Sequence, residues 1–182
     1  MNEDTPGCRI DIAHAKLVEG LVCAHKPARV LEFGFGGGRS AEAILRGLEF
    51  NQEAFDYTLV DSWADWQGSQ PMEAAEFLYA HPEVKLVEMA EREFVHETVE
   101  QFDFIMSDAD HWHTHEWFER VYADLLAPGG VLIYHDVTQF PGLIEIAEKC
   151  RERNLRHVVF EKNTRVGECC QRGLLCIFKE SP

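Results

Sequence analysis

Carboxylates and imidazoles gather in two short stretches of this sequence, and each stretch follows a run of apolar residues. The first, "SDADHWHTH", has Asp108 and Asp110 near its start and His111 directly after them. The second, "YHDVT", contains His135 and Asp136. Carboxylate oxygens with an imidazole suit Mg²⁺, Mn²⁺ or Ca²⁺, and several histidines also tolerate Zn²⁺ or Fe²⁺. Because a histidine titrates near neutral pH, His111 is also a candidate for removing a proton from a hydroxyl group.

The charge around the two principal carboxylates indicates a bound cation. Neither Asp108 nor Asp136 has a lysine or arginine close to it along the chain. Two carboxylates that approach each other repel, and one pKa rises unless a positive charge lies between them. We therefore expect a divalent cation at Asp108 and Asp136, with His135 or Asp110 as a third ligand. The simpler alternative is that Asp108 contacts only a cofactor and Asp136 faces the substrate.

A glycine-rich turn, "LEFGFGGGRS", carries its own acidic residue. Glu32 precedes Gly34, Gly36 and Gly38. Glycines in such a turn allow positive φ and let the backbone approach a ligand closely, as in dinucleotide sites. Glu32 would repel a diphosphate but attract an ammonium group, while Asp61 at the end of the next strand can accept hydrogen bonds from ribose hydroxyls. This combination describes S-adenosylmethionine better than NAD, and a purely structural glycine turn is the alternative.

The elements that must position these groups follow from the apolar periodicity. Expected strands are 29–34, 57–61, 84–89, 102–108, 131–136, 156–161 and 173–180, and expected helices are 9–25, 40–49, 71–81, 92–101, 116–126 and 141–153. Alternating strands and helices predict an α/β fold, with a parallel sheet covered by helices on both faces. In such sheets ligands bind at the carboxyl ends of the strands, where the acidic residues and the glycine turn lie.

The pattern E-x-G-x-G-x-G, followed by an acid at the end of the second strand, resembles the class I S-adenosylmethionine-dependent methyltransferases. The resemblance implies a Rossmann-like doubly wound sheet of seven strands, mostly parallel with the last strand antiparallel. It also implies that the glycine motif lies under the methionine part of the cofactor and that Asp61 binds ribose. Ala90 and Glu91 would then flank the adenine, and Asp108 would contact the cofactor.

Within that family, "D-x-D-H … HD" is similar to the cation-dependent O-methyltransferases of the catechol and caffeoyl-CoA type, and to small sugar and natural-product O-methylating enzymes. The resemblance makes Asp108 the first metal ligand and catalytic, although His135–Asp136 replaces the Asp-Asn pair of the catechol enzymes. His111 falls where those enzymes carry a catalytic lysine. We therefore expect methyl transfer to the hydroxyl group of a small molecule, with His111 as the base.

Composition limits the partners and the compartment. The chain has 182 residues and a formal net charge of −15, which favours one domain over 1–182 and repels nucleic acid and anionic membranes. Its longest apolar runs are strand-sized, its N-terminus does not read as a secretory signal, and its six cysteines are expected to be free thiols in the cytoplasm. The spacing of Cys169, Cys170 and Cys176 matches no zinc pattern.

The acceptor cannot be identified from these residues. Residues 1–25 are expected to form a helical cap that covers it together with the loops 138–143 and 162–172, either alone or with the second subunit of a homodimer. Two other functions remain open: a non-catalytic cofactor-binding or scaffold domain, and a nucleotide-sugar or NAD-linked enzyme on the same sheet. Binding without turnover would indicate the first, and binding of NAD would indicate the second.

Overall fold

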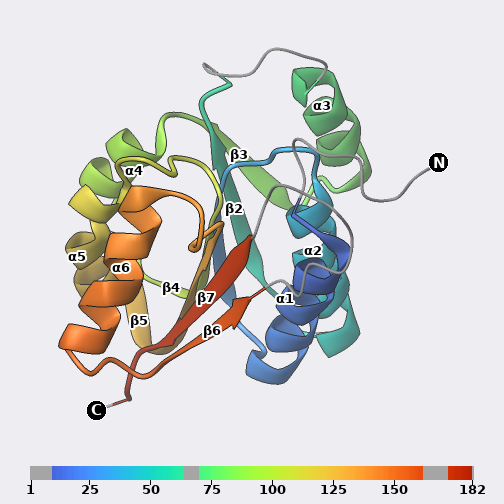
Figure 1. Cartoon of the computed structure of the whole chain (residues 1–182). Coiled ribbons are helices and arrows are strands. Elements are labelled where there is room, and N and C mark those ends of the chain that lie inside the picture. Colours follow the sequence, from blue (N-terminus) through green and yellow to red (C-terminus); the bar gives the residue numbers. More distant parts are fainter. Residues whose placement is uncertain (1–9, 64–69, 162–171, 182) are drawn as a thin grey trace.

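Helices cover both faces of a seven-stranded sheet in the computed structural model, which describes residues 10–63, 70–161 and 172–181 (Figure 1). The strands are β1 Arg29–Phe33, β2 Asp56–Asp61, β3 Val84–Glu88, β4 Phe102–Ser107, β5 Leu126–His135, β6 His157–Glu161 and β7 Gly173–Phe178. The helices are α1 Ile12–His25, α2 Arg39–Asn51, α3 Gln70–Ala80, α4 Glu91–Glu97, α5 Phe118–Arg120 and α6 Pro141–Glu152. A 3₁₀ turn, η1 Thr114–Glu116, precedes α5, and a π-helical turn, η2 Val121–Leu125, continues it.

The strand order is β3-β2-β1-β4-β5-β7-β6. All pairs from β3 to β5 are parallel, whereas β7 runs antiparallel to both β5 and β6. The predicted doubly wound sheet with an antiparallel last strand is therefore confirmed. The order reverses between β1 and β4, so their carboxyl ends form the topological switch point at which such sheets bind ligands.

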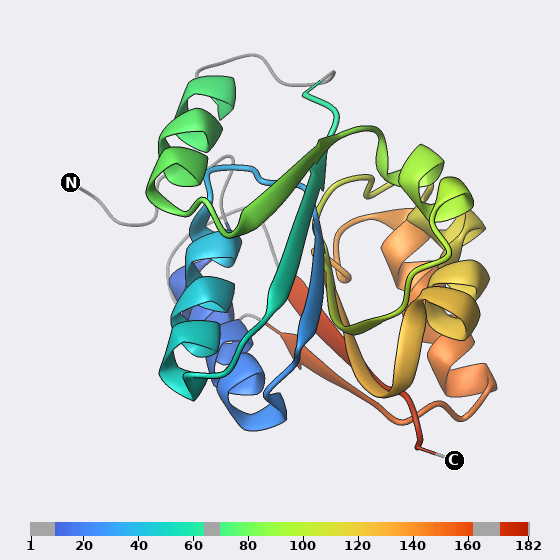
Figure 2. The ribbon, with the colours of Figure 1, turned by 180° about the vertical axis from the view of Figure 1, so that it is seen from behind.

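The two faces of the sheet bury two separate apolar clusters. Helices α1, α2 and α3 lie on one face, and α4, α5 and α6 lie on the other (Figures 1 and 2). The helix expected over 40–49 buries an apolar stripe against the first face, consisting of Ala41, Ile44, Leu45 and Leu48. Because strand β4 contributes side chains to both clusters, its sequence is almost continuously apolar.

The helix expected at 116–126 has a buried apolar face but is not one regular helix. Phe118, Val121 and Leu125 are buried, whereas the backbone passes from a 3₁₀ turn through α5 into the π-helical turn. The ammonium group of Lys179 donates to the carbonyls of Tyr122, Ala123 and Leu126 at 2.9, 2.8 and 2.7 Å. These hydrogen bonds satisfy the carbonyl groups at the end of the helix. Because Lys179 lies in the distant C-terminal segment, local sequence could not predict them.

Two element boundaries differ from the expectation by four residues or more. Strand β5 begins at Leu126 rather than 131, because Leu126 pairs with Phe102 before a register shift. Helix α4 ends at Glu97 instead of continuing to 101, and Arg120 donates to the carbonyls of Val95 and Thr98 at its end. In the described part of the chain, none of the helices has the length and apolar character needed to cross a membrane.

Candidate active site

The loops that follow β1 and β4 are bound to each other at the carboxyl edge of the sheet. The amide of Asp108 donates to the carbonyl of Phe33 at 2.9 Å, and the amide of Gly34 donates to the carbonyl of Val60 at 2.9 Å. A side chain at Gly34 would place its Cβ 2.6 Å from the carbonyl oxygen of Asp108, and Gly34 has a φ of +88°. The glycine turn and the acidic loop therefore meet at a position that only glycine fits.

Glu32 is fully buried beneath this turn. The hydroxyl of Tyr57 donates a hydrogen bond to its carboxylate. Burial raises the pKa of Glu32 to about 8, against hydrogen bonds from Ser40 and Tyr57 that lower it. The side chain is therefore mostly protonated at neutral pH, and an ammonium group placed beside it would favour its ionised form.

Asp61 accepts hydrogen bonds from two backbone amides. Its Oδ2 lies 2.8 Å from the amide of Phe35 in the glycine turn, and its Oδ1 lies 2.9 Å from the amide of Trp63. Each carboxylate oxygen retains a second acceptor site. The structure thus gives Asp61 a role in ordering the glycine turn, and the predicted contact with ribose would use the remaining acceptor sites.

Four side chains from the end of β5 and from the loops after β4 and β5 converge at the same edge. We call Asp108, His111, His135 and Asp136 the acid–histidine cluster. Nε2 of His111 lies 3.1 Å from Oδ1 of Asp108 and 3.5 Å from Oδ2 of Asp136. Nδ1 of His135 lies 3.1 Å from the same Asp108 oxygen and 3.5 Å from Oδ1 of Asp136. Parallel pairing of β4 with β5 brings these groups together, as the sequence predicted.

The protein itself supplies positive charge to this cluster. Burial opposes ionisation of Asp108, but His135 and His111 outweigh it and hold the pKa of Asp108 well below its usual range. Burial lowers the pKa values of both histidines, yet the hydrogen bonds and charges of the aspartates raise them overall. Nε of Arg172 also lies 3.7 Å from Oδ1 of Asp136. Arg172 precedes β7 and is distant from Asp136 in the sequence, so the sequence could not predict this contact.

The residues at the end of β5 suit a divalent cation. Asp108, His135 and Asp136 each offer a ligand atom, and these atoms lie within 4.8 Å of one another. Burial raises the pKa of Asp136, and the charge of Asp108 adds to this rise. The backbone of Asp136 adopts a φ of 62°, a conformation that costs a non-glycine residue about 1 kcal/mol or more. A strained, buried carboxylate beside a second one is a donor set into which a cation fits.

Asp110, the alternative third ligand, is engaged within its own loop. Its Oδ1 accepts hydrogen bonds from the amides of Trp112 and His113 at 3.0 and 2.8 Å. The ring of His113 also lies 3.2 Å from both carboxylate oxygens. These contacts close the turn after β4.

Glu91 occupies a more central position than the sequence indicated. Its carboxylate accepts hydrogen bonds from Ser107, Thr114, Trp117 and the amide of Asp110. Burial raises the pKa of Glu91, and these four hydrogen bonds oppose the rise. The side chain therefore ties the start of α4 to the loop after β4, and a contact between this segment and adenine would come from its backbone.

An aromatic surface adjoins the acid–histidine cluster. The ring of His111 stacks on Phe140 with the centroids 4.6 Å apart, and Trp112 meets the same phenylalanine edge-on at 5.4 Å. Trp112 is 58% exposed, whereas Trp117 is buried in the core. Phe140 lies in the expected covering loop 138–143, but the other expected loop lies mostly outside the described residues.

The cysteines described by the structure do not form part of this site. Cys150 and Cys176 are buried, and burial raises their pKa values to about 11 and 12. Cys169 and Cys170 lie outside the described residues.

Comparisons with known proteins agree with this geometry. A family described as a methyltransferase domain matches residues 31–137, a range that extends from β1 to the end of the acid–histidine cluster. A search of curated proteins gives no significant match.

Several solved structures share the fold. The O-methyltransferase TomG from Streptomyces achromogenes, in complex with S-adenosylmethionine, superposes with a TM-score of 0.75 at 20% identity, over 98% of this chain and 84% of TomG. An O-methyltransferase from Bacillus cereus in complex with S-adenosylhomocysteine gives 0.73 at 20% identity, over 96% and 84% of the two chains. A precorrin 8w decarboxylase from Methanobacterium thermoautotrophicum gives 0.68 at 16% identity, over 94% and 92%.

At these identities the structural matches show the fold alone, while the family match extends over more than half of the chain. The order of the strands, the glycine turn and the acids Glu32 in β1 and Asp61 at the end of β2 all agree with that match. The chain therefore belongs to the methyltransferase-domain family and is a class I S-adenosylmethionine-dependent methyltransferase.

Proposed function

We propose that this methyltransferase transfers the methyl group of S-adenosylmethionine to a hydroxyl oxygen of a small molecule, with His111 as the general base. The observation that carries the proposal is the position of His111, whose Nε2 lies within 3.5 Å of both Asp108 and Asp136. The histidine also adjoins the exposed aromatic surface and follows the loop that contacts the glycine turn.

The cofactor would bind across the switch point of the sheet. Glu32 and the backbone at Gly34, Gly36 and Gly38 would hold its methionine part, and Asp108 would contact the amino group. Gly34, Gly36 and Gly38 all have positive φ, which supports a backbone shaped for a ligand. Asp61 would accept from the ribose, and the backbone of Ala90 and Glu91 would flank the adenine. Binding of this cofactor by TomG and of its product by the Bacillus cereus enzyme supports the assignment.

His111 is oriented for proton transfer. If its Nε2–H donates to Asp108, Nδ1 carries the lone pair that accepts the hydroxyl proton. The acceptor oxygen then attacks the methyl carbon in line with the departing sulfur, the C–S bond breaks, and neutral S-adenosylhomocysteine remains. The imidazolium formed on His111 is stabilised by Asp108 and Asp136, as a carboxylate stabilises the protonated histidine of a catalytic triad.

A divalent cation, Mg²⁺ or a similar ion, is proposed at Asp108 and Asp136 with His135 as a third ligand. Such an ion lowers the pKa of a bound hydroxyl and orients its oxygen. Arg172 already places positive charge beside Asp136, so the cluster has balancing charge even when the ion is absent. The metal is therefore a separate hypothesis from the role of His111.

A small acceptor agrees with the charge and surface of the protein. A net charge of −15 disfavours nucleic acid. The exposed ring of Trp112 and the half-buried ring of Phe140 next to His111 suit a flat acceptor bearing a hydroxyl group, because aromatic rings stack favourably.

The proposal is tested by following S-adenosylhomocysteine formation with a panel of phenols, catechols and sugars. We expect turnover with at least one hydroxyl class and loss of that turnover in His111→Gln. Calorimetry should show binding of S-adenosylhomocysteine and none of NAD. Tight binding with no turnover across the panel would favour a non-catalytic cofactor-binding domain, and binding of NAD alone would overturn the cofactor assignment.

A further inference from the structure

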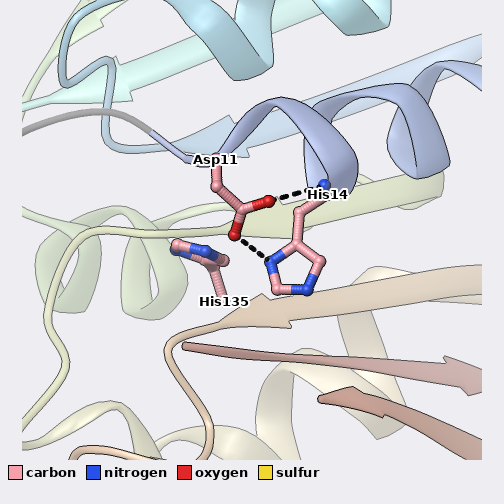
Figure 3. A group of neighbouring side chains, drawn as sticks. All are labelled: Asp11, His14 and His135. Carbon is pink, nitrogen blue, oxygen red and sulfur yellow. Dashed lines mark hydrogen bonds and ion pairs between the residues drawn. The ribbon is translucent and has the colours of Figure 1, made fainter. Parts of the chain in front are cut away.

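A second group of potential ligands lies on the other side of His135, where the first turn of α1 meets the end of β5 (Figure 3). It consists of Asp11, His14 and His135, and we call it the α1 triad. The three residues are 7%, 4% and 0% exposed. Each offers a ligand atom, and these atoms lie within 4.8 Å of one another.

His135 has different surroundings at its two ring nitrogens. Nδ1 lies 3.1 Å from Oδ1 of Asp108, whereas Nε2 is buried and has no hydrogen-bond partner among the residues that the structure describes. A buried polar atom left without a partner costs about 1–3 kcal/mol. With the proton on Nδ1 donated to Asp108, Nε2 presents a lone pair toward the interior. This is the arrangement of metal-bound histidines, in which a carboxylate holds the nitrogen opposite the metal.

Asp11 and His14 are preorganised on one turn of helix. Oδ1 of Asp11 caps the helix by accepting from the amide of His14 at 3.0 Å. Its Oδ2 lies 2.9 Å from Nδ1 of His14, within ion-pair distance. Two ligands at about 2.1 Å from one metal ion lie about 3.0 Å apart at right angles and about 3.4 Å apart in the tetrahedral geometry of zinc sites. The observed separation is close to this range, so a small shift lets both atoms bind one ion.

The ring of His135 completes the group from the sheet. The centroids of the His14 and His135 rings lie 5.5 Å apart and the rings are nearly perpendicular, at 82°. Figure 3 shows the carboxylate of Asp11 between the two imidazoles. The helix thus offers one oxygen and one nitrogen, and the strand offers a second nitrogen.

We propose that the α1 triad binds a transition-metal ion of the Zn²⁺, Co²⁺ or Fe²⁺ type through Asp11, His14 and Nε2 of His135. Two imidazole nitrogens with one carboxylate favour such ions over Mg²⁺, which prefers oxygen ligands. The ion would fasten the N-terminal helix to the end of β5, beside the acid–histidine cluster. Asp108 would act on it only through His135, by fixing the ring and its tautomer.

The α1 triad is distinct from the cation site proposed for the reaction. The reaction site would use Nδ1 of His135 as its third ligand, whereas the α1 triad uses Nε2. A neutral imidazole has only one nitrogen with a free lone pair, so it serves only one of the two sites at a time. An ion in the α1 triad therefore leaves Asp108 and Asp136 as the protein ligands for a hard cation.

The first test is titration of the chelator-treated full-length protein with Co²⁺, followed by the visible absorption of the bound ion. We expect one Co²⁺ per chain, retained in excess Mg²⁺, and at least tenfold weaker binding in His14→Gln. His113→Gln is the matched control, because His113 also lies three residues after an aspartate, at 3.2 Å, but is exposed. The control and Asp136→Asn should both bind as the wild type does.

Two outcomes would overturn the proposal. One is unchanged Co²⁺ binding in His14→Gln. The other is loss of binding in Asp136→Asn with retention in His14→Gln, which would place the ion at the reaction site and leave the proposed function standing.

A second measurement needs no variant and covers the case in which His14→Gln fails to fold. X-ray absorption of the wild-type protein loaded with one equivalent of Zn²⁺ should show two imidazole ligands. The remaining ligands should be oxygen or nitrogen atoms, with no sulfur. A sulfur ligand or a single imidazole would disprove the α1 triad. Neither measurement depends on turnover, so an inactive protein that passes both would contradict only the proposed function.

Discussion

Nε2 of His111 lies 3.1 Å from Oδ1 of Asp108, three residues earlier in the same loop. The aspartate directly follows strand β4 and is held by the hydrogen bond from its amide to the carbonyl of Phe33, and the stacked ring of Phe140 holds the other side of the imidazole. The histidine is therefore fixed in orientation before any acceptor arrives. Such an arrangement is typical of a general base whose second nitrogen performs the proton transfer.

Replacing the base should affect the chemical step and not cofactor binding. We expect His111→Gln to lower kcat by about 10²–10⁴, the usual contribution of a positioned acid or base. The affinity for S-adenosylhomocysteine, measured by calorimetry, should stay within about twofold. His113→Gln serves as the control, because that ring is largely exposed and paired only within its loop. A fall in affinity equal to the fall in kcat would show that His111 binds the cofactor instead.

The glycine turn provides a second prediction. Gly36 has a φ of 52°, a conformation that a β-branched residue adopts only with strain. Gly36→Val should abolish binding of S-adenosylhomocysteine while circular dichroism retains the folded spectrum. Gly34→Ala should instead lower the melting temperature, because its Cβ would lie 2.6 Å from the carbonyl of Asp108. Normal binding by Gly36→Val would make the turn purely structural.

Asp61 tests the ribose assignment. Asp61→Ala should weaken S-adenosylhomocysteine binding by about 1.5–3 kcal/mol, the scale of hydrogen bonds to a charged group. It should also lower thermal stability without ligand, because the amides of Phe35 and Trp63 lose their acceptors. A ligand lacking the ribose hydroxyls separates the two effects. The wild type should discriminate against it, and Asp61→Ala should not; equal discrimination by both proteins would place the ribose acid elsewhere.

Glu32 links stability and cofactor binding to pH. Its pKa is raised from 4.5 to about 8 in the folded protein, chiefly by burial. Between these values the folded state holds a proton that the unfolded state releases, so the free energy of unfolding falls as pH rises. The stabilising contribution is complete below about pH 4.5 and is lost as pH rises through about 8. Glu32→Gln should remove this component from thermal unfolding curves measured across the range; an unchanged pH dependence would contradict the assignment.

The sequence could predict what depends on local pattern and strand order. Parallel strands with alternating helices place Asp108 and Asp136 on adjacent strand ends, and the structure brings them into one cluster. The helix α2 and the glycine turn could also be predicted, because each depends on a pattern within consecutive residues.

What the sequence could not show depends on contacts between distant segments. Arg172 reaches Asp136 from the segment before β7, and Glu91 accepts hydrogen bonds from β4, from η1 and from Trp117, which follows η1. His14 had no functional context in its own helix, and only the packing of α1 brings its ring near His135. Such contacts depend on tertiary packing, which no short spacing encodes.

Metal dependence separates two versions of the mechanism. Asp108 and Asp136 carry ligand atoms within 4.8 Å of each other and of His135, and a cation between them would offset their repulsion. Activity should disappear in excess chelator and return with Mg²⁺ or Mn²⁺. Asp136→Asn should raise the metal concentration required for half-maximal activity at least tenfold. His14→Gln should leave this concentration unchanged, because the imidazole of His14 lies on the Nε2 side of His135, away from Asp108 and Asp136.

The competing version relies on the protein's own cations. Arg172 lies 3.7 Å from Asp136, and two histidines with raised pKa values lie beside Asp108. Full activity in excess chelator, with no metal in the purified protein by elemental analysis, would remove the ion from the mechanism. His111 would then act alone as the base, and Asp136→Asn should lower kcat without any dependence on added metal, because the imidazolium loses one of its two carboxylates.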